Sequence, residues 1–124
     1  MFDHVVFAVS DYAASKEFFV KALAPLGVVV VSEGRLGIEL SHRNSKASLC
    51  IRLQPEPKPS HLHLAFAAES RGQVQAFYRA ALEAGAKDNG PPGLRPIYNE
   101  NYYAAFVIGP DGHNIEAVCH EAED

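Results

Sequence analysis

A chain of 124 residues, of which 48% are hydrophobic and 21% charged, is long enough to bury one core and too short for several domains. Its charge argues against nucleic acid as a partner, because 15 Asp and Glu outweigh 11 Lys and Arg and leave a net charge of −4. No apolar run approaches the ~20 residues of a membrane span, and we expect no signal peptide, because a strand is predicted within a few residues of Met1. Cys50 and Cys119 lie far apart in the sequence and do not have the spacing of a metal-binding pair. We therefore expect two free thiols, as in a protein of the reducing cytoplasm.

The first half of the chain predicts a strand, a helix and three more strands. A strand is expected at residues 4–9, where small side chains alternate with bulky ones. A helix is expected over residues 12–26, since Asp11 is a suitable N-cap and Gly27 a suitable stop for an apolar helical stripe. Three β-like runs come next, at residues 28–32, 36–40 and 47–53.

The second half opens after a proline-spaced connector at residues 54–60 (QPEPKPS), which cannot lie inside a sheet. A strand at residues 63–68 and a helix from the Ser70 cap to the Gly85 stop are expected to follow. The Pro- and Gly-rich stretch 87–101 predicts one short strand and a loop.

The chain then ends in a predicted β-hairpin. Apolar runs at residues 104–108 and 114–118 flank residues 109–112 (GPDG), in which Pro presets φ and Gly tolerates positive φ. Glu116 lies inside the second run, and a carboxylate in an apolar strand is costly unless its charge is compensated. Glu116 is therefore predicted to line a wet cavity or to bind a cation. The histidines that border this last strand, His113 and His120, are expected to be exposed.

The two halves of the chain repeat one unit. Residues 4–9 (HVVFAV) align with residues 63–68 (HLAFAA), with His on His and Phe on Phe. We therefore predict an α+β fold, in which paired βαβββ modules form a cupped mixed sheet and the helices cover one face. Module one spans about residues 1–54 and module two about residues 61–120, within a single domain of residues 1–124.

Three residues of this arrangement suit a divalent metal. His4 and His63 both fall on the small-residue face of their strands, which the helices leave open, and Glu116 enters from the last strand. Two imidazoles and a carboxylate suit Fe(II), Mn(II), Ni(II) or Zn(II) and leave positions open for substrate. Taken singly, a strand His is more often a structural residue and a strand Glu more often solvated. The equivalent placement of the two histidines favours the metal site.

A family resemblance rests on three stretches of the sequence. The residues DHVVFAVSD near the start, HLHLAF at the midpoint and YYAAFVIGPDGHNIEAV at the end resemble the glyoxalase/bleomycin-resistance/extradiol-dioxygenase (vicinal oxygen chelate) superfamily over nearly the whole chain. The resemblance implies paired βαβββ modules, a divalent metal, a small-molecule substrate and a homodimer. It places His4, His63 and Glu116 on three ligand positions of that family.

Three positions depart from named members of the family. Glyoxalase I has a fourth ligand, a Glu, where this chain has Cys50. A small buried Cys is expected there, with a thiolate ligand as the alternative. The fosfomycin-resistance transferases and the extradiol dioxygenases carry a Tyr where this chain has Phe106, and the transferases use a hydroxyl where it has Val6. None of the three named activities therefore transfers cleanly.

The catalytic candidates follow from the register of the hairpin. If Phe106 lies opposite Glu116, Tyr102 shares the metal face and Tyr103 lies on the other face. A slip of one residue exchanges the two tyrosines, so Tyr102 is ranked first and Tyr103 second. Because a phenol near a metal-bound oxygen acts as a donor, acid or base, Glu116 and Tyr102 are the catalytic candidates.

The substrate-binding candidates are two arginines and two aromatic residues. A guanidinium holds anionic groups, so Arg52, on the strand of Cys50, and Arg95, in the loop before the hairpin, are expected to contact substrate. Tyr103 and Phe106 complete this set.

These features predict a metal-dependent lyase or isomerase of the glyoxalase type, in which the metal acts as a Lewis acid on neighbouring oxygens of a small substrate. The alternatives are a metal-free drug-binding protein of the bleomycin-resistance type, a ring-cleaving extradiol-type dioxygenase, and a structural domain with unused ligands. A homodimer is expected because an open sheet has edges to satisfy. The sequence leaves open the substrate, the metal (Zn, Ni, Mn or Fe), a need for glutathione, and whether the modules pair within one chain or between two.

Overall fold

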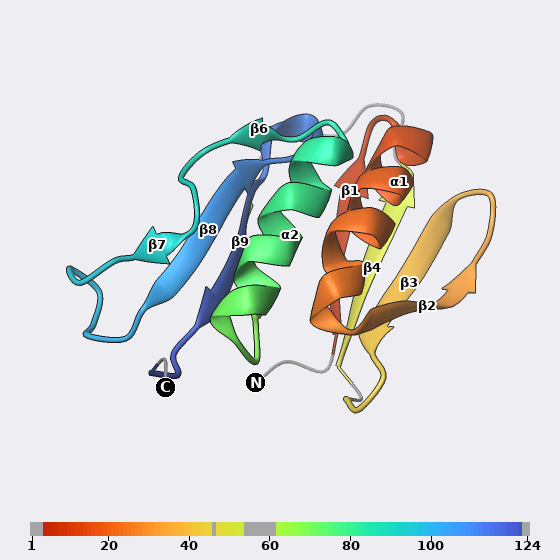
Figure 1. Cartoon of the computed structure of the whole chain (residues 1–124). Helices are drawn as coiled ribbons and strands as arrows, with labels where there is room; N and C mark the ends of the chain where they lie inside the picture. Colours follow the sequence, from red (N-terminus) through yellow and green to blue (C-terminus); the bar gives the residue numbers. More distant parts are fainter. Residues whose placement is uncertain (1–3, 46, 54–61, 123–124) are drawn as a thin grey trace.

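Strands and helices of the computed structural model follow the predicted order in both halves of the chain (Figure 1). The structure describes residues 4–45, 47–53 and 62–122. The connector predicted at residues 54–60 lies outside the described residues. No helix of the described part is long and apolar enough to cross a membrane.

Module one forms a four-stranded mixed sheet with one helix. Its strand order is β1-β4-β3-β2, with β1 parallel to β4 and the other pairs antiparallel. The elements are β1 (His4–Val9), α1 (Tyr12–Leu23), the 3-10 turn η1 (Ala24–Leu26), β2 (Val28–Glu33), β3 (Gly37–His42) and β4 (Ser48–Leu53).

Module two repeats this plan and adds one short strand. Its strand order is β5-β9-β8-β6, and β7 also pairs with β8. The elements are β5 (His63–Ala67), α2 (Arg71–Glu83), β6 (Lys87–Asp88), β7 (Gly93–Leu94), β8 (Tyr103–Ile108), η2 (Pro110–Gly112) and β9 (Asn114–Cys119). The prediction of a single short strand between residues 87 and 101 is wrong: two strands of two residues each pair with β8, because prolines interrupt the segment between them.

The predicted starts of both helices are confirmed by their caps, whereas α1 ends at Leu23 and the 3-10 turn η1 continues the chain to the Gly27 stop. The side chain of Asp11 accepts a hydrogen bond from the Ala14 N–H at 3.0 Å, and that of Ser70 accepts one from the Gln73 N–H at 3.1 Å. At the other ends, Gly27 and Gly85 take positive φ angles of 83° and 97°, which only glycine adopts without strain.

Both helices cover the same side of the sheets and pack against each other (Figure 1). Each fully buried Phe or Ile between the layers contributes about 1.5–3 kcal/mol. The opposite side is open: Val6, on the same face of β1 as His4, is 49% exposed. The core holds Phe7, Phe18, Phe19, Ile51, Phe77, Val107 and Ile115. The α+β fold and the open, histidine-bearing face predicted from the sequence are therefore confirmed.

Within the described residues, the two modules keep separate sheets. β1 is an edge of the first sheet and β5 an edge of the second, and no strand pairing joins them in that part of the chain. The modules meet through the helices and through a contact between Ser10 and the hairpin turn, where the Ser10 N–H and hydroxyl donate to the Asp111 carboxylate at 3.1 and 2.5 Å. Asp111 reaches this position with a φ of 62°, which Asp tolerates better than most residues.

Candidate functional site

The candidate site lies on the open face of module two, around Glu116. Strand β9 is central, so Glu116 lies opposite Ala65 of β5 on one side and Phe106 of β8 on the other. This is the register predicted for the hairpin. Glu116 is only 1% exposed, although it lies on the face that the helices leave open. Its charge therefore needs compensation from its neighbours.

Two side chains provide that compensation. The Nε2 atom of His63 lies 2.8 Å from Oε1 of Glu116, and the hydroxyl of Tyr102 donates a short hydrogen bond to Oε2. Since each oxygen of the carboxylate has a polar partner, the buried group is satisfied on both sides. His63 is 54% exposed in its side chain, so the cluster opens to solvent on the imidazole side.

Tyr102 is held as a proton donor. Burial, followed by its hydrogen bond to Glu116 and the charge of that carboxylate, raises the pKa of Tyr102 to about 12. The Tyr98 ring lies 4.9 Å from the Tyr102 ring, and the His120 ring meets it edge-on at 5.2 Å. At neutral pH the phenol is therefore protonated and donates to Glu116.

Tyr103 lies on the opposite face of β8, against α2. Its hydroxyl accepts a hydrogen bond from Gln75 Nε2 at 3.0 Å, and the Arg71 guanidinium lies 5.1 Å from its ring centre. The sequence ranking of Tyr102 over Tyr103 agrees with this placement, and the structure does not bring Tyr103 to the Glu116 cluster.

The two predicted arginines lie in different modules. The Arg95 guanidinium lies 5.5 Å from the centre of the Phe106 ring, which is itself 6.2 Å from the ring of His63. Arg95 and Phe106 therefore border the Glu116 cluster. Arg52 is exposed on β4 of module one, opposite Ala8 and Gly37.

His4 occupies the position in module one that His63 occupies in module two. It lies on the edge strand β1, paired with Ser48. Within the described residues, no three His, Cys, Asp or Glu side chains lie together in a group that could hold a metal ion. A single chain thus brings His63 and Glu116 together and does not add His4 to them.

A second carboxylate, Glu39, was missed in the sequence. It lies on β3, directly opposite Cys50, which in turn lies opposite Val6. Cys50 is partly buried, and its thiol is free. The signal for Glu39 is present in the sequence, because it interrupts the apolar pair Ile38 and Leu40 as Glu116 interrupts β9.

The expectation of an exposed His113 is wrong. This residue is 4% exposed, its Nδ1 accepts a hydrogen bond from the Leu62 N–H at 3.0 Å, and its ring meets Phe7 edge-on at 5.3 Å. The hairpin turn closes over module one and buries the imidazole at the module junction. His120 is exposed, as expected.

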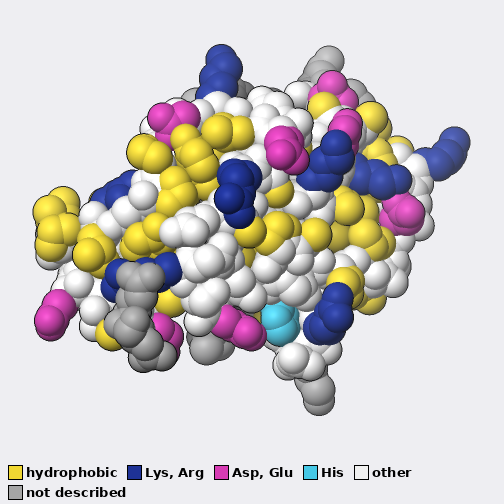
Figure 2. All heavy atoms as spheres, viewed as in Figure 1, with side chains coloured by type: hydrophobic (Ala, Val, Ile, Leu, Met, Phe, Trp, Pro, Cys, Tyr) yellow, Lys and Arg dark blue, Asp and Glu magenta, His cyan; other side chains and the backbone are white. Residues whose placement is uncertain are grey.

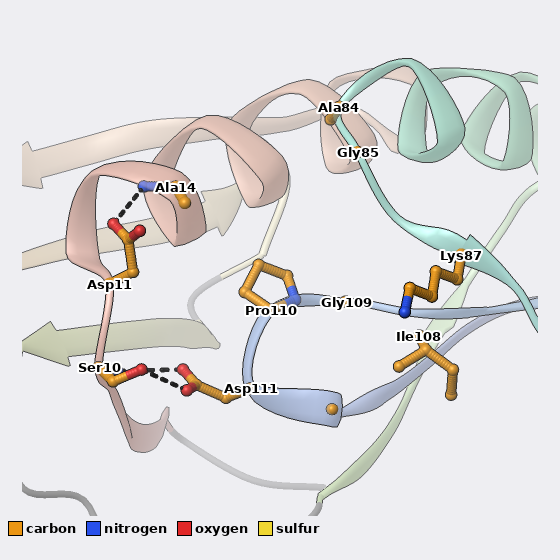
Figure 3. A pocket seen from close by; sticks show the side chains of 11 residues that line it. Ser10, Asp11, Ala14, Ala84, Gly85, Lys87, Ile108, Gly109, Pro110 and Asp111 are labelled. Carbon is orange, nitrogen blue, oxygen red and sulfur yellow. Dashed lines mark hydrogen bonds between the residues drawn. The ribbon is translucent and has the colours of Figure 1, made fainter.

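Two cavities lie at opposite ends of the module junction. One, of about 550 Å³, is bordered by the start of α1, the end of α2 and the hairpin turn, and contains the Ser10–Asp111 contact (Figure 3). The other, of about 470 Å³, is mainly apolar and lies between Leu23, Leu26, Leu40 and β5. Neither is lined by His63, Tyr102 or Glu116.

The donor set of the cluster fits a divalent cation in its residue types. An imidazole nitrogen and a carboxylate oxygen already lie 2.8 Å apart, and Zn(II), Ni(II), Mn(II) and Fe(II) all accept these ligands. Glu116 is buried, so a cation beside it would compensate a charge that now relies on hydrogen bonds. A third donor has to come from outside the cluster.

Comparisons with known proteins agree on one family. The model of the glyoxalase/bleomycin resistance protein/dioxygenase superfamily matches residues 1–117. A glyoxalase/bleomycin resistance protein from Albidiferax ferrireducens T118 is 30% identical, with a TM-score of 0.80 over 96% of this chain and 98% of that one. A putative glyoxalase from Bacillus halodurans is 24% identical, with a TM-score of 0.74 over 96% and 95%.

A bleomycin resistance determinant encoded on the transposon Tn5 shares the fold, with 16% identity and a TM-score of 0.66 over 98% of this chain and 99% of that one. No curated protein matches the chain.

Proposed function

Because the chain belongs to the glyoxalase/bleomycin resistance protein/dioxygenase superfamily, we propose that it is a divalent-metal-dependent lyase or isomerase acting on a small substrate with neighbouring oxygens. The observation that carries this proposal is the 2.8 Å contact between His63 Nε2 and Glu116 Oε1 at a buried carboxylate. Cys50 and Cys119 are free thiols, which agrees with a cytoplasmic location.

The residues that would hold the metal come from two copies of the chain. His63 and Glu116 of one copy supply two ligands, and His4 of a second copy supplies the third, so a homodimer is part of the proposal. The separate sheets of the two modules support this arrangement, since the β1 and β5 edges have no strand partner among the described residues. When bound, a divalent ion there supplies Lewis-acid stabilisation of negative charge on a substrate oxygen.

Tyr102 and Glu116 have different roles in proton transfer. Tyr102 holds its proton at neutral pH and donates it as a hydrogen bond to Glu116 Oε2 or to a substrate oxygen on which negative charge develops. Glu116 accepts protons, and without a metal His63 Nε2 holds its other oxygen and orients the carboxylate, a contact that a bound ion would replace. Phe106 and Arg95 border the same space, which shields the carboxylate from water on the β8 side.

Metal analysis tests the proposal directly. Protein purified without added metal, and then offered Zn(II), Ni(II), Mn(II) or Fe(II) separately, is expected to bind one ion per chain. His63→Ala and Glu116→Gln should abolish binding, whereas His42→Ala, a histidine outside the site, should leave it intact. A folded protein that takes up none of these ions but binds drug-like ligands would overturn the proposal in favour of sequestration.

Mixing two inactive variants tests the contribution of the second copy. A His4→Ala chain and a Glu116→Gln chain each lack one ligand, but their heterodimer keeps one complete site. Coexpression should restore about a quarter of the wild-type metal content, because about half of the dimers are mixed and each mixed dimer has one good site of two. If the coexpressed chains are folded and dimeric but contain no metal, a shared site is contradicted.

A further inference from the structure

We propose that Arg95 is the specificity residue of this site and that the substrate is a small carboxylic acid with a planar, apolar body. The inference rests on the proposed function only for where the reacting oxygen lies. The recognition of the acid is argued from Arg95 and its surroundings, and it is tested without metal or turnover.

The guanidinium of Arg95 is held in a fixed place. Its Nη2 donates a hydrogen bond to the Pro91 carbonyl at 2.7 Å, and its central carbon lies over the Phe106 ring, 5.5 Å from the ring centre. A Cβ added to Gly90 would lie 3.1 Å from Nη2, and one added to Gly93 would lie 3.1 Å from Nη1. Gly90 also has a φ of 142°, which disfavours any other residue. Two glycines thus leave the space that the guanidinium fills.

The charge of Arg95 is left for a ligand. Among the described residues, no carboxylate lies within ion-pair distance of the Arg95 guanidinium. Elsewhere on the surface, by contrast, the Lys16 ammonium and the Glu33 carboxylate form an ion pair. One of its five N–H donors is used by Pro91, and the planar fork of the others matches a carboxylate. A single guanidinium carries one positive charge, which matches a monoanionic carboxylate better than a phosphate dianion.

A series of aromatic contacts connects Arg95 with the Glu116 cluster. Phe106 is the shared neighbour of the guanidinium and of His63, at 5.5 and 6.2 Å. Tyr98 continues this wall from the ring of Tyr102 and is 59% exposed. Ile97 is also exposed, whereas Leu94, opposite Tyr103, lies on the helix side of β8, where Figure 2 shows hydrophobic side chains gathered around β7. Rings that are fixed and open to solvent suit a planar apolar body.

Matched acids and amides test this inference. Benzoate and phenylacetate are titrated against benzamide and phenylacetamide at constant ionic strength, and binding is followed by ¹⁵N NMR at the Arg95 Nε–H and the Gly90 and Gly93 amides. The wild-type protein should bind each acid at least about tenfold more tightly than its amide, about 1.4 kcal/mol. Arg95→Gln should remove that preference, and Arg95→Lys should keep part of it, since an ammonium lacks the planar fork.

Two further variants separate charge from geometry. Gly93→Ala keeps the charge but displaces Nη1, so it should reduce the preference several-fold. Arg52→Gln removes an arginine from module one and should leave the preference unchanged. Equal binding of acid and amide by the wild-type protein, or a preference lost in Arg52→Gln and kept in Arg95→Gln, would overturn the inference. If Arg95→Gln does not fold, Arg95→Lys and Gly93→Ala decide the question.

The two proposals fail separately. Glu116→Gln and His63→Ala should lose metal and keep the preference for acids, because neither change touches Arg95. A protein that binds acids through Arg95 but takes up no metal would contradict the proposed function alone. A protein that binds metal but does not distinguish acids from amides would contradict the present inference alone.

Discussion

The two modules share the same strand register but carry different side chains at the matching positions. Val6 lies opposite Cys50 in module one, as Ala65 lies opposite Glu116 in module two. His4 and His63 occupy matching positions, and Nε2 of His63 lies 2.8 Å from Glu116 Oε1, whereas no group of three such side chains that includes His4 is found among the described residues. The duplication therefore supplied two scaffolds, and the chemistry of the proposed site was concentrated on one of them.

The partner strands explain why Glu116 can be buried. Phe106 faces Glu116 from β8, and Tyr102, four residues earlier, supplies a hydroxyl. In module one, Glu39 faces Cys50 from β3, and the residue four positions before it is the exposed Arg35. A buried carboxylate needs donors on both sides. Module one instead places its acidic residue on the neighbouring strand, opposite Cys50.

The largest expected difference between the modules is in metal affinity. Glu116→Gln removes the negative charge at nearly constant volume and should weaken binding of a divalent ion by about 100-fold. Glu39→Gln and Cys50→Ser, the matched changes in module one, should each change it by less than about threefold. Isothermal titration with Zn(II) or Ni(II) measures all three. If the module-one changes proved the more damaging, the roles of the two modules would have to be exchanged.

The next largest difference between the modules concerns the glycines that end their helices, Gly27 and Gly85. Gly27→Ala forces a Cβ into a positive φ and within 2.9 Å of His42 Nε2, so it should lower the free energy of unfolding by about 2 kcal/mol. Gly85→Ala has the same backbone strain but nothing within 4 Å of the added Cβ, so it should cost about 1 kcal/mol. Urea unfolding of the two variants gives the comparison. Equal losses would show that the His42 side chain moves aside.

The tyrosines on the two faces of β8 differ in their pH dependence. Tyr102→Phe leaves Glu116 Oε2 without its donor and should cost about 1.5 kcal/mol at neutral pH. Because folding raises the pKa of Tyr102 to about 12, the stability from its protonated form is complete below pH ~10 and is lost as the pH rises through about 12. The difference in stability between the wild type and Tyr102→Phe should therefore disappear over that pH range.

Tyr103→Phe is the matched control for this experiment, since its hydroxyl meets Gln75 on the helix side. Tyr103→Phe should lower the free energy of unfolding by about 1 kcal/mol or less. Its difference in stability from the wild type should not disappear between about pH 10 and 12. Thermal melts at several pH values measure both variants. An absorbance titration near 295 nm should also lose its highest-pH phenol in Tyr102→Phe; persistence of that phenol would assign it to another tyrosine.

The smallest expected effect concerns the two ends of the module junction. Asp111→Ala removes the acceptor of two hydrogen bonds from Ser10 and should cost about 1 kcal/mol. At the other end, Glu69 lies 4.0 Å from His42 and is 75% exposed in its side chain, so Glu69→Ala should cost less than about 0.5 kcal/mol. Chemical unfolding ranks them, and a larger loss for Glu69→Ala would reverse the ranking.

The helices and strands, the faces of the strands and the register of the hairpin could be predicted from the sequence. Caps at Asp11 and Ser70, alternation in the first strand of each half and the turn at residues 109–112 are local signals. They act between residues close in the chain, so periodicity and turn chemistry predict them. The meeting of Phe106 and Glu116 follows from the length of that turn.

Contacts between residues from distant segments could be seen only in the folded chain. The fold buried His113 under the hairpin turn against Phe7. It also set Arg95 between Gly90 and Gly93, over Phe106. These placements depend on the packing of strands and loops far apart in sequence, which local periodicity does not describe.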